Sequence, residues 1–238
     1  MAGIVAPILP ARDKTSKWTP KVGRRTRSFI DSLASDDFPR KTKDTLIDET
    51  YRILSSCHDP NNEGSNRTTG LIVGRVQSGK TTSFKALSMM AFDNNFELII
   101  LLAGRTNNLI EQNINAFIEL KDSISDKFNI GYVSKPKEWE AIISTNIQRI
   151  RGFGSMRAMP LILITNKHAG HISKISQELR KSNLNLEDIN ALIIDDEADN
   201  ASLNTAKDKD SDFSASAIYK SIKSLRNNLE RHTVAQYT

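Results

Sequence analysis

Short, continuous apolar runs recur from about residue 69 onward, and helix-length polar segments separate them. Such runs are typical of strands in a parallel sheet with helices on both faces, because both sides of each strand are then buried. The runs lie at residues 70–74, 98–103, 130–133, 161–165 and 191–194, with a last candidate at 233–237. The pattern predicts an α/β domain over residues 66–238.

The first 65 residues follow a different pattern and are more polar. The spacing of their apolar residues predicts one helix over roughly 22–35 and another from Pro39 to about Ser56. A small helical N-terminal region is therefore expected before the α/β domain. Its basic residues fit either a solvated helix face or a contact with DNA, and they include Arg24, Arg25 and Arg27.

Residues 74–81 read GRVQSGKT and match the phosphate-loop pattern G-x-x-x-x-G-K-[ST]. The match follows a predicted strand and precedes a predicted helix from Thr81 to about Phe92, which is the context that the pattern requires. Glycines let the loop turn its N–H groups toward phosphates, and the helix N-terminus adds positive charge. In this arrangement Lys80 meets the β- and γ-phosphates of ATP, while the Thr81 hydroxyl binds Mg²⁺. The expected nucleotide contacts are Gly74, Gln77, Ser78, Gly79, Lys80, Thr81 and Thr82.

A second candidate motif follows the apolar run at 191–194, where three acids come in succession. In a P-loop NTPase such a strand is expected beside the phosphate-loop strand, with an aspartate that holds Mg²⁺. We assign Asp196 to the metal and Glu197 to the general base that polarises the attacking water. Asp195 is the rival for the metal, because one sequence does not establish which acid faces the nucleotide.

Three segments resemble motifs of superfamily 2 helicases and translocases. Residues 196–199 resemble their DEAD motif, residues 102–112 resemble motif Ia, and residues 165–168 end the fourth predicted strand, where such motors touch a nucleic-acid backbone. The resemblance implies a RecA-like P-loop ATPase domain. It also implies nucleic-acid contacts at Arg105, Thr106, Thr165 and Lys167. For Arg105 and Thr106, capping of the next helix is the open alternative.

The segments GRVQSGKT (74–81), LAGRTNNL (102–109) and DDEADNAS (195–202) together resemble the family named for the Z-one domain. This is a family of candidate endonucleases linked to superfamily 2 ATPase modules and to bacterial restriction or phage defence. The resemblance covers about residues 67–238 and implies DNA as a partner, with a nuclease, a methyltransferase or another defence-system protein. Outside the acids of the ATPase motif, the sequence has no carboxylate–lysine cluster of the nuclease type.

In the same superfamily, the strand after the acidic motif ends in Thr-Ala-Thr or Ser-Ala-Thr, and Thr238 resembles the first residue of that motif. We therefore expect the domain to be truncated at its C-terminal end and to lack the second RecA-like lobe. The arginine that such a lobe supplies is worth roughly 10³–10⁵ in rate in related NTPases. On this hypothesis the isolated chain hydrolyses ATP very slowly.

Composition adds three constraints. The net charge of +5 mildly favours a polyanion partner. The single cysteine, Cys57, excludes a disulfide framework and makes the cytoplasm the expected compartment. No run of about 18 apolar residues is present, so no membrane-spanning helix is expected.

Two function classes stay open after these observations. The first is an ATP-hydrolysing motor that acts on DNA, with ATP and Mg²⁺ as its nucleotide and metal. The second is an ATP-gated switch or binding module without motor activity. A small-molecule kinase is a weaker third reading, because kinases of this fold usually lack a DEAD-type strand end.

Overall fold

The computed structural model describes residues 18–238 apart from residues 35, 65, 74–78, 105, 133–138, 153–157, 183–185 and 199–211. Within these residues, six strands form one sheet in the order β1-β6-β5-β2-β4-β3, and every neighbouring pair is parallel. The strands are β1 (Asn66–Ile72), β2 (Leu98–Ala103), β3 (Asn129–Tyr132), β4 (Leu161–Asn166), β5 (Asn190–Asp195) and β6 (Arg231–Tyr237). The prediction of an α/β fold with a parallel sheet is confirmed.

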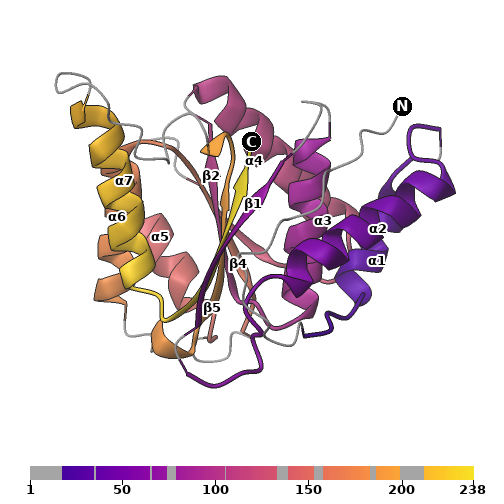
Figure 1. Ribbon diagram of the computed structural model, residues 1–238, viewed down its shortest axis with the longest axis horizontal. Coiled ribbons are helices and arrows are strands. Elements are labelled where there is room, and N and C mark those ends of the chain that lie inside the picture. The colour runs from indigo at the N-terminus through magenta and orange to yellow at the C-terminus, as the bar shows by residue number, and fades with distance from the viewer. Residues whose placement is uncertain are drawn as a thin grey trace.

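Helices cover both faces of the sheet (Figure 1). One layer holds α1 (Arg24–Ser32), α2 (Arg40–Ser55), α3 (Lys80–Asp93) and α4 (Asn107–Ser123). The opposite layer holds α5 (Trp139–Gln148), α6 (Ala169–Lys181) and α7 (Asp212–Asn227), and a short 3₁₀ helix, η2 (Leu186–Asp188), precedes β5. The layered arrangement agrees with the continuous apolar runs, since the central strands are buried on both sides.

The two faces of the sheet have separate hydrophobic cores. Successive side chains of a strand point to opposite faces. In β2, for example, Ile99 and Leu101 pack in the core under α3 and α4, whereas Leu98 and Ile100 pack in the core under α5, α6 and α7. The same alternation continues through β4 and β5, and it decides below which way the acids at the end of β5 point.

The two predicted N-terminal helices are present as α1 and α2, and both pack against α3. Asp93 at the end of α3 accepts hydrogen bonds from the backbone N–H groups of Arg25 and Thr26 and from the Thr26 hydroxyl, at 2.7–3.1 Å. These bonds satisfy donors in the first turn of α1 that have no partner inside the helix. Arg25 and Arg24 also form ion pairs, with Asp93 at 4.0 Å and Asp126 at 3.6 Å.

The segment that follows α2 is anchored to the sheet by a buried histidine. The two ring nitrogens of His58 lie 2.9 Å from Thr233 Oγ1 and 3.2 Å from Asn190 Oδ1. Burial is the main reason why the pKa of His58 falls to about 4. The neighbouring Cys57 is buried as well, and burial raises its pKa to about 12, so its thiol stays protonated at neutral pH.

One topological expectation is wrong. The acidic strand β5 does not lie beside β1, the strand that precedes the predicted phosphate loop, because β6 pairs with both and separates them. β6 can occupy this position because most of its residues are buried, including Val234 and Ala235 on its two faces. The consequence for the site is small, since all strands are parallel and their carboxyl ends meet at one edge of the sheet.

Candidate functional site

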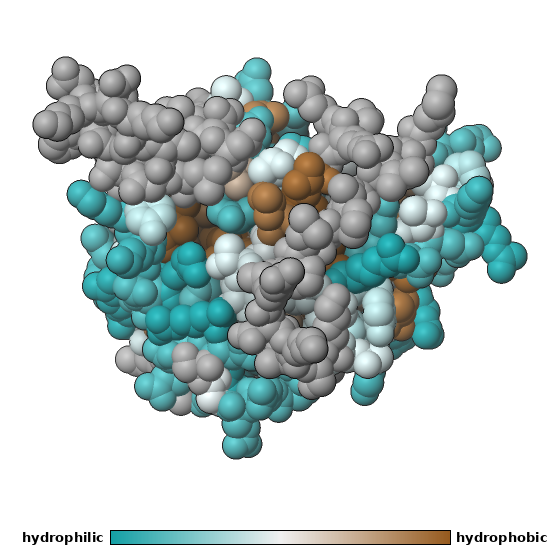
Figure 2. All heavy atoms as spheres, in the orientation of Figure 1, coloured by the Kyte–Doolittle hydropathy of each residue, from teal (hydrophilic) through white to brown (hydrophobic). Residues whose placement is uncertain are grey.

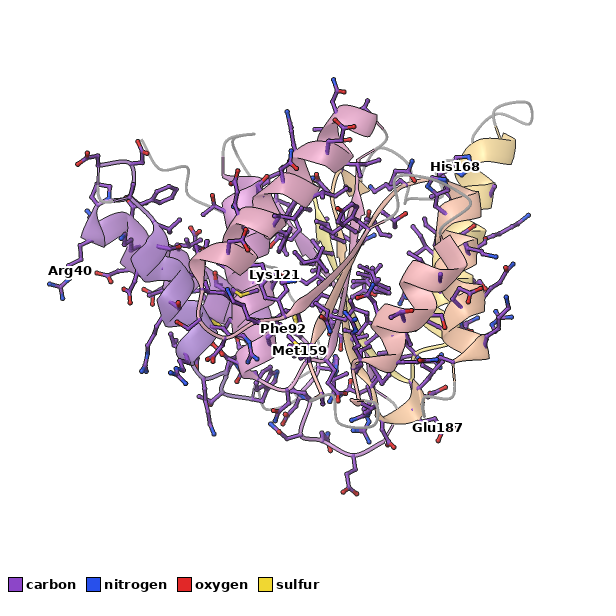
Figure 3. The ribbon with its side chains drawn as sticks, turned by 180° about the vertical axis from the view of Figure 1, so that it is seen from behind. Arg40, Phe92, Lys121, Met159, His168 and Glu187 are labelled. Atoms are coloured by element: carbon purple, nitrogen blue, oxygen red, sulfur yellow. The ribbon has the colours of Figure 1, made fainter. Side chains whose placement is uncertain are left out.

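The candidate site lies at the carboxyl-end edge of the sheet. Figure 3 shows His168, which follows β4, at this edge, whereas Met159 and Glu187, which precede β4 and β5, lie at the opposite edge. Helix α3 begins at the same edge, where its first residue, Lys80, lies 4.0 Å from Asp196. Open parallel sheets generally bind ligands in crevices outside the carboxyl ends of their strands.

The start of α3 has the backbone of a helix that follows a glycine turn. Gly79 is the N-cap residue, with φ at 116°, a left-handed conformation that favours glycine. Lys80 is the first helical residue, and the Thr81 and Thr82 side chains are half-buried in the first turn. The remaining predicted loop contacts, Gly74, Gln77 and Ser78, lie outside the described residues.

Asp196 faces this helix start. Its carboxylate Oδ1 lies 4.0 Å from the Lys80 ammonium, and the residue is only 8% exposed. Oδ1 accepts no hydrogen bond from a described residue. Burial raises the pKa of Asp196, the nearby Lys80 charge lowers it, and the neighbouring Glu197 charge raises it again. The result is a buried carboxylate with free bonding capacity beside a positive helix terminus.

Asp195 faces the opposite layer, because adjacent residues of a strand alternate. Its Oδ1 lies 2.7 Å from the ammonium of Lys167, and both side chains are buried, with exposures of 1% and 0%. The geometry thus favours Asp196 at the candidate site, because Asp196 lies beside Lys80 whereas Asp195 is paired with Lys167.

Two of the residues predicted to contact nucleic acid, Thr165 and Lys167, are buried. Lys167 has no exposed side-chain surface, and its ammonium is shared between Asp195 and the backbone carbonyl of Glu197, at 2.6 Å. Thr165 is 4% exposed, and its hydroxyl donates to the Asn166 carbonyl at 3.4 Å. Neither side chain is accessible to a nucleic-acid backbone, because strand alternation turns both into the core under α6.

The other two predicted contacts have different outcomes. Arg105 lies outside the described residues. Thr106 is exposed and caps α4, since its hydroxyl accepts a hydrogen bond from the Leu109 N–H at 3.4 Å. Capping was the open alternative for Thr106, and a nucleic-acid contact by this residue stays a prediction.

Glu197 is a special backbone position that sequence reasoning missed. Its φ of 52° is left-handed, which is uncommon for a residue other than glycine. Its carboxylate packs over Gly104 at the end of β2, where a Cβ atom would lie 3.2 Å from Glu197 Oε2 and 2.8 Å from a Leu109 methyl. The glycine in residues 102–104 (LAG) was the available sequence signal for this close approach.

Two histidines, His168 and His171, lie side by side near the site. The rings of His168 and His171 lie 4.9 Å apart at the start of α6, and burial lowers the pKa of His171. Across the part of the chain that the structure describes, no cluster of three or more His, Cys, Asp or Glu residues is arranged to hold a metal ion.

A separate cavity of about 490 Å³ opens between β1, β6 and α7. None of the candidate nucleotide residues lines it; its cationic lining residues are Arg67, Lys223 and Arg226. Hydrophobic residues form small patches among hydrophilic ones on the face shown in Figure 2. The exposed large hydrophobic residues include Leu71 in β1, Val73 just after this strand, and Tyr219 on α7.

Comparison with protein-family models and with curated proteins finds no match for the chain. Membrane insertion through a helix is not indicated either: within the described residues, every helix is too short or too polar to cross a bilayer. The resemblance to the Z-one family stays a prediction that depends on the motifs quoted above.

Proposed function

We propose that this chain binds ATP with Mg²⁺ at the carboxyl-end edge of its sheet and hydrolyses it. The observation that carries the proposal is the meeting of Lys80, at the N-terminus of α3, with the buried Asp196 carboxylate, at 4.0 Å. A cation and a carboxylate beside a helix N-terminus are the pair that phosphoryl chemistry uses, one for the phosphates and one for the metal.

The residues present are suited to Mg²⁺. Asp196 Oδ1 is buried and accepts no hydrogen bond from a described residue, so it has capacity for a ligand. The Thr81 hydroxyl stands in the first turn of the same helix as Lys80. Oxygen ligands from one carboxylate and one hydroxyl, completed by water and phosphate, match the preference of Mg²⁺. When bound, the ion would neutralise charge on the phosphates.

The other residues have separate roles in this proposal. Lys80 binds the β- and γ-phosphates and offsets their charge. Glu197 acts as the general base, because its carboxylate can accept a proton from the water that attacks the γ-phosphate. Backbone N–H groups at the start of α3 add hydrogen bonds and the positive end of the helix dipole.

The wider assignment depends on the resemblance alone. We propose that the ATPase belongs to a superfamily 2-like DNA-dependent motor of a bacterial restriction or phage-defence system, and that it acts with a nuclease, a methyltransferase or another partner. The net charge of +5 is compatible with a DNA partner. An ATP-gated switch is the alternative, and a cytoplasmic location remains part of the proposal.

The first test compares two lysines of α3. Lys80→Ala should weaken Mg²⁺–ATP binding at least 10-fold and lower single-turnover hydrolysis by about 10³-fold, because it removes the cation at the phosphates. Lys85→Ala makes the same charge change further along the helix and should leave both quantities near the parent values. Equal ATP binding and hydrolysis in a folded Lys80→Ala protein would refute the proposed site.

A second arm separates the motor from the switch. Hydrolysis by the parent protein is measured with and without double-stranded and single-stranded DNA. Stimulation that disappears at high salt, where backbone contacts are screened, supports the motor. ATP turnover that is indifferent to DNA in the presence of every partner chain of the system supports the switch.

A further inference from the structure

The buried ion pair of Lys167 and Asp195 is unusual because the lysine makes a second contact. Its ammonium lies 2.7 Å from Asp195 Oδ1 and donates to the Glu197 backbone carbonyl at 2.6 Å. Lys167 itself is anchored at the end of β4, where its backbone N–H donates to the Ala103 carbonyl of β2 at 3.2 Å. Through its backbone N–H and its ammonium, this one residue thus joins the ends of three neighbouring strands, β2, β4 and β5.

The residue held by this contact has a backbone that needs support. A left-handed conformation is unfavourable for a residue with a Cβ atom and persists where surrounding contacts impose it. The φ of Glu197 is 52°, and the Lys167 ammonium donates a hydrogen bond to the backbone carbonyl of this same residue. On the other side, Gly104 leaves the space in which the Glu197 carboxylate lies.

Side chains alternate in direction along β5, and this explains why Asp195 is the counter-ion of Lys167. Asp196 points toward Lys80 and Asp195 points away, so Asp195 is available to neutralise the lysine inside the core under α6. A buried ammonium without a counter-ion would be strongly unfavourable. The pair therefore delivers a fully desolvated donor to the Glu197 carbonyl, where its hydrogen bond is stronger than in water.

We propose that Lys167, neutralised by Asp195, is a positioning residue that fixes the left-handed turn of Glu197 and so holds the Glu197 carboxylate at the edge shared with Lys80 and Asp196. This inference rests on the proposed ATPase function for its kinetic consequence, but not for the geometry of the turn. It gives the buried Lys167 a role within the protein in place of the predicted nucleic-acid contact.

The main variant replaces both charges, Lys167→Met with Asp195→Leu. An apolar pair of similar volume often keeps a protein as stable as the buried ion pair did, so the fold should persist while the bond to Glu197 is lost. We expect the nucleotide Kd to stay within about 3-fold and single-turnover hydrolysis to fall roughly 100-fold, as for small misplacements of a catalytic group.

A double-mutant cycle distinguishes positioning from a general structural effect. If Lys167 acts through Glu197, adding the charge replacement to Glu197→Gln should cause little further loss, because residues that act as a unit are not additive. A rate loss that multiplies with that of Glu197→Gln, or an equal loss of nucleotide affinity, would overturn the proposal.

Nuclear magnetic resonance tests the geometry without hydrolysis. In the unmodified chain the Lys167 ammonium should give a side-chain signal protected from solvent exchange, and the Glu197 carbon shifts should report a left-handed backbone. The charge replacement should shift Glu197 toward ordinary backbone values. A rapidly exchanging Lys167 ammonium, or Glu197 shifts that the replacement leaves unchanged, would refute the inference. Should the parent chain fail to bind ATP, the proposed function fails and this measurement still decides the positioning role.

Discussion

Asp195 and Asp196 are adjacent in the chain, yet they occupy opposite kinds of environment. Asp195 is 1% exposed and lies 2.7 Å from the Lys167 ammonium, inside the core under α6. Asp196 is 8% exposed, and its nearest charge partner, Lys80, is 4.0 Å away. Neither Oδ1 atom accepts a hydrogen bond of good geometry from a described residue, so the two carboxylates differ in how closely a lysine ammonium approaches them, 2.7 Å for Asp195 and 4.0 Å for Asp196.

The difference separates a structural carboxylate from one that is available for binding. A buried ion pair with short contacts holds its two partners in place, and removal of either one leaves an uncompensated charge. A buried carboxylate with unused bonding capacity costs stability until a ligand supplies the missing partner. Such perturbed groups gather at functional sites, which is why Asp196 rather than Asp195 carries our proposal.

The largest effect is expected on turnover and separates Asp196 from its other neighbour, Glu197. Asp196→Asn should weaken Mg²⁺-dependent nucleotide binding and hydrolysis together, because it removes charge from the metal ligand. Glu197→Gln should keep nucleotide affinity while hydrolysis falls about 10²–10⁴-fold, the usual contribution of a general base. Isothermal titration and single-turnover assays measure both. Parent-rate hydrolysis by the Glu197→Gln protein would show that the base assignment is wrong.

The loss of stability should differ in size between the two lysines. Lys167→Met leaves Asp195 buried without a counter-ion and should lower the free energy of unfolding by about 3–5 kcal/mol. Lys80→Met removes a longer, partly exposed pair and should cost less than about 1 kcal/mol. Urea denaturation of the two variants makes the comparison. Equal losses would mean that the two carboxylates do not differ in the way described here.

The smallest effect is a gain of stability at Asp196 that depends on pH. Its pKa is raised in the folded protein, so the folded state binds more protons than the unfolded state, and the parent protein loses stability as pH rises through this window. Asp196→Asn should therefore melt slightly above the parent at pH 7, and the gain should disappear below about pH 4, where an unfolded aspartate is protonated. Asp195→Asn is the matched control and should melt below the parent at pH 7. A lower melting temperature for Asp196→Asn at pH 7 would contradict the availability of this carboxylate.

The pattern of apolar runs was sufficient for most of the fold. Each predicted run corresponds to a strand, and the two N-terminal helices and the helix expected after the predicted phosphate loop are present. Continuous burial on both faces leaves a strong signal in local sequence, because every residue of such a strand must be apolar. The order of the strands was not predictable in this way, since pairing partners lie far apart in the chain and the runs resemble one another.

For the candidate site, local sequence indicated which residue types are present but not which way their side chains point. The segment 195–197 identified three acids at a strand end, and the helix start after Gly79 identified the lysine. Which acid faces Lys80 depends on the register of β5 against its neighbours, and a shift of one residue would exchange the two faces.

Lys167 shows the same limit most clearly. As a cation after a strand, in a segment that resembled a nucleic-acid contact, it was expected at the surface. Lys167 is two residues after Thr165 of β4, so its side chain points to the same face of the sheet. There it meets Asp195 of β5, which is separated from β4 by β2. Burial of a charge is decided by whether a counter-charge from a distant part of the chain arrives at the same place, and only the packed sheet brings these two residues together.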